Sequence, residues 1–248
     1  MNILVCISQV PDTTAKIQVS GDGKSIEKTG IKFILNPYDE FAIEEGLRLR
    51  ERFGGTVTAL TVGPETSKEI LRTALAMGVD KAGIVKTDDI LDSYNVAENI
   101  AGYAKSISPD LVIFGRQSID FDSSGMAPMV AEMLDLPSIS VVSSWNIENN
   151  AITAERDIEG GKEVLTCSIP CVISAQKGLN DPRYPKLPDI MKAKSKPIEE
   201  IASCHGSALV SLTSMALPSS KRVGMIVGDS EAEIASIVTA LHEQAKVI

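Results

Sequence analysis

Short apolar runs rich in β-branched residues recur along the first half of the chain. Runs of this length and composition are typical of strands that are buried on both faces of a sheet. We therefore predict strands at residues 2–10, 56–63, 81–86 and 110–115.

Amphipathic segments fill the intervals between these runs. Residues 38–53 carry apolar side chains at helical spacing, and similar stripes run through residues 70–77, 96–107 and 126–134. Strands that alternate with helices in this way indicate βαβ units, whose right-handed crossovers build a parallel sheet. The pattern predicts an α/β fold with helices on both faces of the sheet.

Two segments interrupt the alternation. Residues 15–35 have alternating apolar positions around "SGDGK", which predicts a hairpin inserted after the first strand. Residues 139–175 read as antiparallel strands joined at "ENN" and "EGG". We expect these strands to extend the sheet after the fourth helix.

The composition changes from residue 176 onward. Prolines and lysines become frequent, but apolar residues recur among them, so we predict an ordered surface loop followed by an extended arm rather than a free linker. Residues 229–248 carry an apolar stripe and a capping residue, Asp229 or Ser230, which predicts a short amphipathic helix.

Composition then narrows the classes of function. Of the 248 residues, 44% are hydrophobic and 23% charged, which is typical of a globular protein. The formal net charge of −9 disfavours a nucleic-acid partner, because duplex binding relies on Lys and Arg. No apolar run is long enough to span a membrane and no signal-like segment opens the chain, so we expect a cytoplasmic protein that is not integral to a membrane.

Signatures of catalysis and of metal binding are missing from the sequence. The four cysteines form no CxxC pair and have no histidines at zinc-finger spacing, which predicts no metal site. The chain also lacks the GxGxxG, GxxxxGK[ST], GxSxG and HExxH motifs. A nucleotide site without these groups would bind rather than turn over its ligand, so we predict no catalytic residue.

The loop "GRQSIDFDSSGMAP" follows the fourth predicted strand and leads into a helix. Ligands of open parallel sheets bind beyond the carboxyl ends of the strands. The loop places Gly115, Ser118, Ser123, Ser124 and Gly125 at the mouth of that helix, where free backbone N–H groups carry partial positive charge. A phosphate group fits such a place without a lysine.

An ordinary strand-to-helix turn is the alternative for this loop. Asp122 or Ser123 would then cap the helix. The carboxylates of Asp120 and Asp122 count against a phosphate unless they face ribose hydroxyls or solvent.

The stretch "LNPYDE" is a second candidate at the same edge of the sheet. Asn36 precedes Pro37, the expected first residue of a helix, so its side chain either caps that helix or binds a ligand. With the glycine turn at Gly63, three loops would face one edge, and together they favour a nucleotide site.

Several stretches resemble the β-subunit family of electron transfer flavoproteins over nearly all of the first 200 residues. They are "ILVCISQVPD", "LNPYDEFAIEEGLRLRE", "LRTALAMGVDKA", "LVIFGRQSID", "ERDIEGGKEVL", "IPCVISA" and "LNDPRYPKLPDIMKAKSKPI". The last of these is the most specific.

The resemblance implies a Rossmann-like domain and an α-subunit partner that holds the electron-carrying FAD. The expected role is to carry electrons from flavin dehydrogenases, such as the acyl-CoA dehydrogenases of fatty acid oxidation, to a downstream acceptor. The resemblance also implies structural AMP in this chain. Its contacts carry over onto Cys6, Asn36, Pro37, Tyr38, Asp39, Val62, Gly115, Arg116, Gln117, Ser118, Ile119, Asp120, Phe121, Asp122, Ser123, Ser124, Gly125 and Met126.

A bifurcating branch of the family is the first alternative, because it binds a second, redox-active FAD in place of AMP. Its loop resembles "DGDTAQVGP", whereas this chain has "DFDSSGMAP". The loop keeps Asp120 and Asp122 but lacks the Gln-Val-Gly portion, which weakens the bifurcating interpretation and also departs from the usual AMP loop. The second alternative is a free-standing ATP-binding module or ATP-dependent enzyme, against which the apolar residues of the arm argue.

The resemblance also implies two surfaces for partners. Residues 179–190 match the loop that recognises the client dehydrogenase, with Arg183 and Tyr184 in it and Leu187 as the apolar anchor. The alternative for Leu187 is a leucine tucked against its own domain. Asp157 matches an acidic residue that pairs with an arginine of the α subunit.

These expectations divide the chain into two parts. Residues 1–195 would form the nucleotide-binding domain, and residues 196–248 an arm and helix that pack on the α subunit. The full prediction is an α/β, Rossmann-like parallel sheet with helices on both faces, an antiparallel extension and a C-terminal arm.

Overall fold

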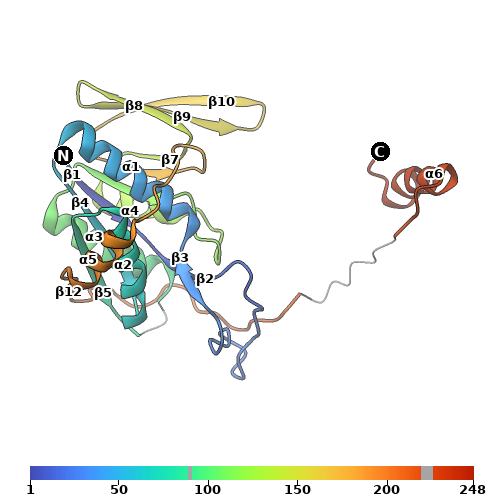
Figure 1. Ribbon diagram of the computed structural model, residues 1–248, viewed down its shortest axis with the longest axis horizontal. Coiled ribbons are helices and arrows are strands. Elements are labelled where there is room, and N and C mark those ends of the chain that lie inside the picture. The colour runs from blue at the N-terminus through green and yellow to red at the C-terminus, as the bar shows by residue number, and fades with distance from the viewer. Residues whose placement is uncertain (89–90, 219–225) are drawn as a thin grey trace.

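A seven-stranded parallel sheet forms the centre of the molecule, as a computed structural model of the chain shows (Figure 1). The structure describes residues 1–88, 91–218 and 226–248. The strands are arranged in the order β12-β5-β4-β1-β6-β11-β7, and each neighbouring pair is parallel. Their bounds are β1 Asn2–Cys6, β4 Thr56–Gly63, β5 Lys81–Lys86, β6 Leu111–Gly115, β7 Ser138–Val142, β11 Cys171–Ala175 and β12 Glu199–Ile201.

Helices cover both faces of this sheet, as the sequence predicts. The helices of the body are α1 Pro37–Phe53, α2 Lys68–Met77, α3 Ser93–Ile107, α4 Met126–Leu134 and α5 Leu187–Ser195, whereas α6 Glu231–Thr239 does not cover the sheet (Figure 1). Alternate side chains of β1 separate the two layers: Ile3 and Val5 join the core under α1 and α2, whereas Leu4 joins the core under α3 and α4. Burial on both faces explains why the strands read as continuous apolar runs.

Residues 139–175 divide between two sheets, which corrects one detail of the prediction. β7 and β11 join the main sheet in parallel. Only β8 Ser144–Glu148, β9 Ala151–Ile158 and β10 Gly161–Ser168 are antiparallel, and they form a separate three-stranded sheet beside the body (Figure 1). All five residues of β11 are buried, as a strand between two parallel neighbours requires, while β10 alternates exposed and half-buried residues and leaves one face to solvent.

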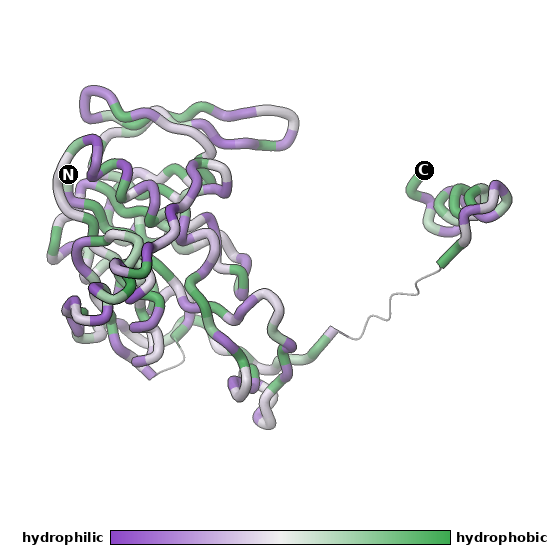
Figure 2. Tube along the Cα trace, viewed as in Figure 1, coloured by the Kyte–Doolittle hydropathy of each residue, from purple (hydrophilic) through white to green (hydrophobic). Residues whose placement is uncertain are grey.

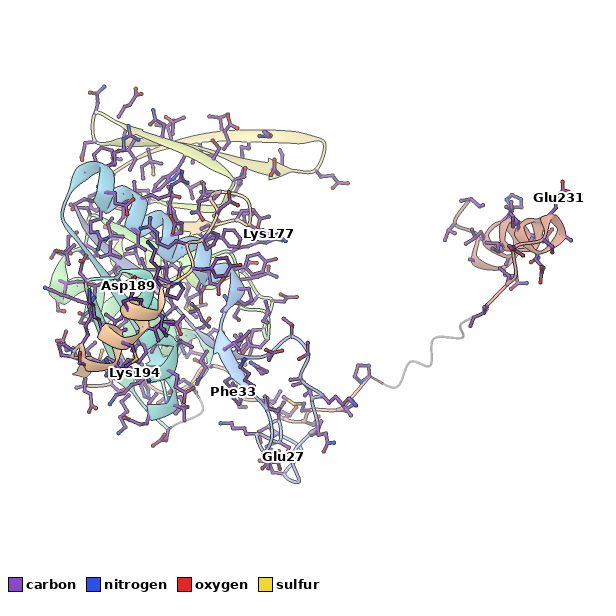
Figure 3. All side chains as sticks on the ribbon, viewed as in Figure 1. Glu27, Phe33, Lys177, Asp189, Lys194 and Glu231 are labelled. Carbon is purple, nitrogen blue, oxygen red and sulfur yellow. The ribbon has the colours of Figure 1, made fainter. Side chains whose placement is uncertain are left out.

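The insertion predicted as a hairpin at residues 15–35 is mostly irregular. Between residues 15 and 32, its one strand-like contact in the described chain is the bridge between Val19 and Ile26. Phe33–Leu35, strand β3, pairs instead with Gln9–Pro11, strand β2. Figure 3 shows Phe33 where the insertion leaves the body and Glu27 near its far end. The polar composition of the insertion offers little apolar surface to pack, so a regular hairpin has nothing to stabilise it.

The segment after residue 176 contains more regular structure than the expected loop and arm. Leu187–Ser195 forms the helix α5. Pro188 does not prevent this, because it occupies the first turn, where a proline costs no hydrogen bond. Glu199–Ile201 then pairs with β5 as the seventh strand. The predicted terminal helix is present as α6, with Ser230 as its N-cap in a capping box. No described residue of α6 is buried, and Figures 1 and 2 show this partly hydrophobic helix away from the body.

Candidate functional site

The sheet reverses its direction of growth between β1 and β6, and we call the region beyond the carboxyl ends of these two strands the crevice. The chain leaves β1 through α1 toward β4 on one side, and it returns from β5 through α3 to β6 on the other side. Ligands of open α/β sheets bind at such a switch point. The carboxyl ends of the two strands lie side by side there, with Cys6 opposite Phe114.

Asp39 joins the two sides of this crevice. Its Oδ2 accepts hydrogen bonds from the backbone N–H of Ser8 at 2.7 Å and from the Ser8 hydroxyl at 2.9 Å. Its Oδ1 accepts one from the Gly115 N–H at 3.2 Å. A Cβ at Gly115 would lie 2.6 Å from the carbonyl carbon of Tyr38 and 2.7 Å from the Asp39 nitrogen, so only glycine allows β6 to approach α1 this closely.

Asn36 links the start of α1 to the loop after β6. Its Nδ2 donates to the Gln117 carbonyl at 2.9 Å, and its Oδ1 accepts from the Ile119 N–H at 3.3 Å. The side chain is fully buried and makes no capping bond to the described helix, although Asn36 holds the N-cap position. The capping role considered for Asn36 is therefore wrong, because both polar atoms are engaged 81 and 83 residues away.

The loop itself is held by a small polar network. Ser124 donates its hydroxyl proton to Oε1 of Gln117 at 2.8 Å, and Nε2 of Gln117 donates to Oδ1 of Asp122. The Asp122 N–H donates to the Ser118 carbonyl at 2.9 Å. Asp122 and Ser124 adopt left-handed backbone conformations, with φ of 55° and 53°. Such residues are uncommon outside turns and indicate a backbone shape that the surroundings impose.

The first turn of α4 presents backbone N–H groups at the mouth of the crevice. Gly125 is the N-cap, and among the described residues no side chain accepts a capping bond there. The cap by Asp122 or Ser123, considered as the alternative for this loop, is therefore not formed among the described residues. Nε of Arg116 is also buried without a hydrogen-bond partner in the described chain. The uncapped start of α4 fits an anionic ligand at this place.

Burial sets the protonation of the ionisable groups beneath the loop. Desolvation raises the pKa of Asp39 to about 7, although the hydrogen bonds from Ser8 and Gly115 and the neighbouring Asn36 amide act in the opposite direction. Burial, with a smaller contribution from the Asp39 charge, raises the pKa of the Cys6 thiol well above its usual value. A thiol held in its neutral form is a poor nucleophile, so this arrangement favours binding over covalent chemistry.

The remaining predicted residues lie along the same carboxyl edge. Phe121 is 77% exposed at the tip of the loop, and its N–H donates to the carboxylate of Asp120. Both aspartates that count against a phosphate are exposed. The others fall at the carboxyl ends of β1 and β4, in the loop after β6, and in the first turns of α1 and α4: Cys6, Val62, Arg116, Ser118, Ile119, Pro37, Tyr38 and Met126.

Sequence reasoning missed two residues that shape this edge, Ser8 and Gln9. Ser8 supplies two of the bonds to Asp39. Gln9 holds the loop after β4, since its Nε2 donates to the Thr66 carbonyl at 3.2 Å and its Oε1 accepts from Ser67 at 3.2 Å. The sequence offered one signal for them: both residues closely follow the first strand, at the edge of the sheet where ligands bind.

The residues expected to meet protein partners lie elsewhere. Leu187 is 72% exposed at the start of α5, so it is not tucked against its own domain, and Tyr184 is 92% exposed. Arg183 does not project outward, because its guanidinium binds Glu44 and Glu51 of α1. Asp157 is exposed on β9 in the three-stranded sheet.

The part of the chain that the structure describes has neither a candidate metal cluster nor a candidate membrane span. No group of three or more His, Cys, Asp and Glu side chains in residues 1–88, 91–218 and 226–248 could hold a metal ion. Across the same ranges no helix has both the length and the apolar character that a membrane crossing requires.

Comparison with known proteins agrees with this architecture. Residues 24–205 match the model of the electron transfer flavoprotein domain. An electron transfer flavoprotein subunit beta of Bacillus subtilis (strain 168) is 40% identical over the whole of both chains, and one of Bradyrhizobium diazoefficiens is 33% identical, again over the whole of both. The mold Dictyostelium discoideum has one that is 39% identical over 78% of each chain. The chain therefore belongs to the electron transfer flavoprotein family, among its β subunits.

Proposed function

We propose that this chain pairs with an electron transfer flavoprotein α subunit and that the heterodimer carries electrons from flavin dehydrogenases, such as acyl-CoA dehydrogenases, to a downstream acceptor. In this proposal the α subunit holds FAD, which supplies the electron-carrying chemistry when bound. This chain holds a structural nucleotide and contacts the client. We propose the cytoplasm as its place of action.

The observation that carries the nucleotide proposal is the uncapped start of α4. A helix N-terminus without a side-chain acceptor attracts anions through its free N–H groups and its dipole. Ser124 and Gly125 bring the backbone to that point, and the loop that leads there also carries the cation of Arg116. These residues fit the phosphate of AMP.

This chain's own groups would bind and orient rather than react. Asp39 is engaged by three donors and Asn36 by two partners, so both hold the crevice in shape. The neutral Cys6 thiol supplies no nucleophile. We therefore propose a non-catalytic subunit.

The terminal helix and the three-stranded sheet are the surfaces that we propose for the α subunit. Ile234 and Val238 of α6 are more than half exposed, and an apolar stripe of this kind buries against a partner. Asp157 would approach the same partner from β9. We propose the exposed residues around Leu187 as the client surface.

Gly125→Val tests the nucleotide site with little disturbance of the fold. A Cβ at Gly125 would meet only the Ser123 carbonyl, at 3.8 Å among the described atoms, so the protein itself has room for a side chain. A ligand at the mouth of α4 would lose that space. The heterodimer should be purified, its nucleotide released and identified by mass spectrometry, and its nucleotide content compared with that of the Gly125→Val heterodimer.

Gly161→Val is the matched control, because a Cβ there meets no described atom within 4 Å and lies in β10, away from the crevice. We expect one AMP per wild-type and Gly161→Val heterodimer, and a content at least about tenfold lower in Gly125→Val. If a second FAD is released instead of AMP, the bifurcating alternative would take the place of the AMP proposal. Full AMP content in Gly125→Val would disprove the phosphate site at α4.

A further inference from the structure

The segment from Tyr184 to Met191 is exposed although it is rich in apolar residues. Tyr184, Leu187 and Met191 are 92%, 72% and 60% exposed. We name residues 184–191 the docking segment. Apolar side chains on a loose segment of this length would collapse onto the body, so something must hold them outward.

One end of the docking segment is fixed to α1 by Arg183. Nε and one terminal nitrogen donate to the two oxygens of Glu44 at 2.8 and 2.9 Å, and the other terminal nitrogen donates to Glu51 at 2.6 Å. The Arg183 backbone N–H also donates to Glu44, at 3.1 Å. Bidentate pairing of this kind fixes orientation as well as distance.

Asn180 strengthens the same end. Its Nδ2 donates to the Phe41 carbonyl at 3.0 Å and to Oε2 of Glu45 at 2.8 Å. The other oxygen of Glu45 accepts from the indole N–H of Trp145 at 2.7 Å. Helix α1 thus holds residues 180–183 through two buried carboxylates, those of Glu44 and Glu45.

The other end of the docking segment is fixed to α2 by Arg72. One terminal nitrogen of Arg72 donates to the Ala193 carbonyl at 2.7 Å and also to the Lys196 carbonyl. These carbonyls lie at the C-terminus of α5, where a cation also complements the helix dipole. Ala193 is buried, and Lys196 donates to the Val79 carbonyl at 3.1 Å. Figure 3 shows Asp189 and Lys194 along this short helix against the body.

We infer that Arg183 and Arg72 are positioning residues that hold the docking segment as a preformed surface for the client dehydrogenase, an inference that rests on the function proposed above. A surface already ordered in the free protein loses less conformational entropy on binding, which strengthens association without any new contact. Neither arginine touches the client in this account. Exposed Lys186, Lys192 and Lys194 border the apolar residues, so the fitting client surface is an apolar pocket edged by carboxylates.

Hydrogen exchange on the heterodimer measures the positioning directly. The Asp189 and Ile190 N–H groups donate to the Lys186 carbonyl in the first turn of α5, so their exchange reports whether this turn is formed. Arg183→Lys keeps the charge but loses the bidentate pairing with Glu44, and Arg72→Lys keeps the charge on a shorter side chain that reaches the two carbonyls less well. We expect each to speed exchange at these amides by about tenfold.

Steady-state kinetics then measures whether the client binds more tightly because the docking segment is already ordered. With an acyl-CoA dehydrogenase, reduced by its acyl-CoA substrate, as the varied electron donor, both variants should raise KM by about fivefold and leave kcat unchanged. Leu187→Ala should raise KM without changing the exchange. Arg50→Lys is the matched control, because Arg50 also binds a carbonyl and a carboxylate, those of Gly78 and Asp80, but does not hold the docking segment.

The outcomes separate the inference from the function on which it rests. Unchanged exchange in either arginine variant would overturn the positioning role. Faster exchange with an unchanged KM, while Leu187→Ala raises KM, would also overturn it but leave the docking proposal standing. An unchanged KM in Leu187→Ala would show that the client does not dock here and would overturn both.

Discussion

The crevice beyond β1 and β6 and the docking segment are both proposed to contact something outside the chain, yet different contacts hold them in place. In the crevice, Asn36 and Asp39 are buried and bind backbone groups of the opposite side. The docking segment is instead exposed in its middle and fixed at its ends, by contacts that include those of Arg183 and Arg72.

The difference follows from what each region is proposed to hold. A small ligand needs a cavity whose walls are set to within a fraction of an ångström, and buried side chains that bind backbone provide this. A protein partner needs apolar side chains that reach outward, so the fixing contacts must lie beside them. Changes in the crevice should therefore reduce the stability of the whole domain, whereas changes at the docking segment should act locally.

Gly115→Ala should have the largest effect. The new Cβ meets backbone atoms of Tyr38 and Asp39 at 2.6 and 2.7 Å, and backbone cannot rotate away as a side chain can. We expect a loss of about 4 kcal/mol of unfolding free energy together with loss of the nucleotide. Thermal and denaturant unfolding of the heterodimer measure the first, and mass spectrometry the second.

Gly161→Ala serves as the control for Gly115→Ala, since no described atom lies within 4 Å of the Cβ it adds. Its stability should stay within about 0.5 kcal/mol of the wild type. If Gly115→Ala were as mild, the close approach of β6 to α1 would not constrain the crevice, and the contrast between the two regions would be lost.

The pKa of Asp39 makes the stability of the crevice depend on pH. The carboxyl titrates at about 7 in the folded protein, above its usual 3.8. As the pH rises past 4, the unfolded chain releases its proton while the folded chain keeps it, so unfolding becomes easier until the folded group also ionises near pH 7. The stabilisation is therefore complete below about pH 4 and lost as the pH passes about 7.

Asp39→Asn removes this titration, so the informative quantity is the difference in unfolding free energy between wild type and variant. The wild type should lose about 3 kcal/mol relative to Asp39→Asn between about pH 4.5 and pH 8. Denaturant unfolding at several pH values provides the measurement. A constant difference would mean that Asp39 stays ionised and that its three donors outweigh its burial.

How much of the fold could be predicted from the sequence depends on how far apart in the chain the contacting residues are. Strands β1, β4, β5 and β6 show as continuous apolar runs and helices α1 to α4 as apolar stripes at helical spacing, and both signals are local properties of the sequence. The apolar run of β11 looks the same whether its neighbour is parallel or antiparallel, so its place between β6 and β7 could not be predicted. Only packing against the rest of the sheet decides it.

The same limit applies to the site. The glycine-bracketed loop and the stretch around Asn36 could be found because ligands gather at the carboxyl edge of a parallel sheet. The bond from Asn36 to residue 117 and the clamp of Arg183 on Glu44 join residues 81 and 139 positions apart. A capping asparagine and a bridging asparagine have the same sequence neighbours, so only the fold distinguishes them.

Asn36→Ala should have a smaller effect than the first two changes. It leaves the Gln117 carbonyl and the Ile119 N–H without their partner beneath the loop, and unsatisfied buried groups cost about 2 kcal/mol in total here. Thermal unfolding measures the loss. Asn146→Ala, at an exposed side chain that binds Glu148, is the control and should lie within about 0.5 kcal/mol of wild type.

Trp145→Phe should have the smallest effect. It tests the difference between the two regions by a change beside the docking segment instead of in the crevice. It keeps most of the aromatic surface but removes the indole N–H that binds Oε1 of Glu45, leaving Asn180 as a donor to the other oxygen. We expect about 1 kcal/mol of lost stability, and faster hydrogen exchange confined to residues 179–183. The crevice amides of Gly115 and Ile119 should exchange as in wild type, because their acceptors Asp39 and Asn36 are untouched. Exchange that rises equally in both regions would show that helix α1 couples them, and that the crevice and the docking segment do not act as separate units.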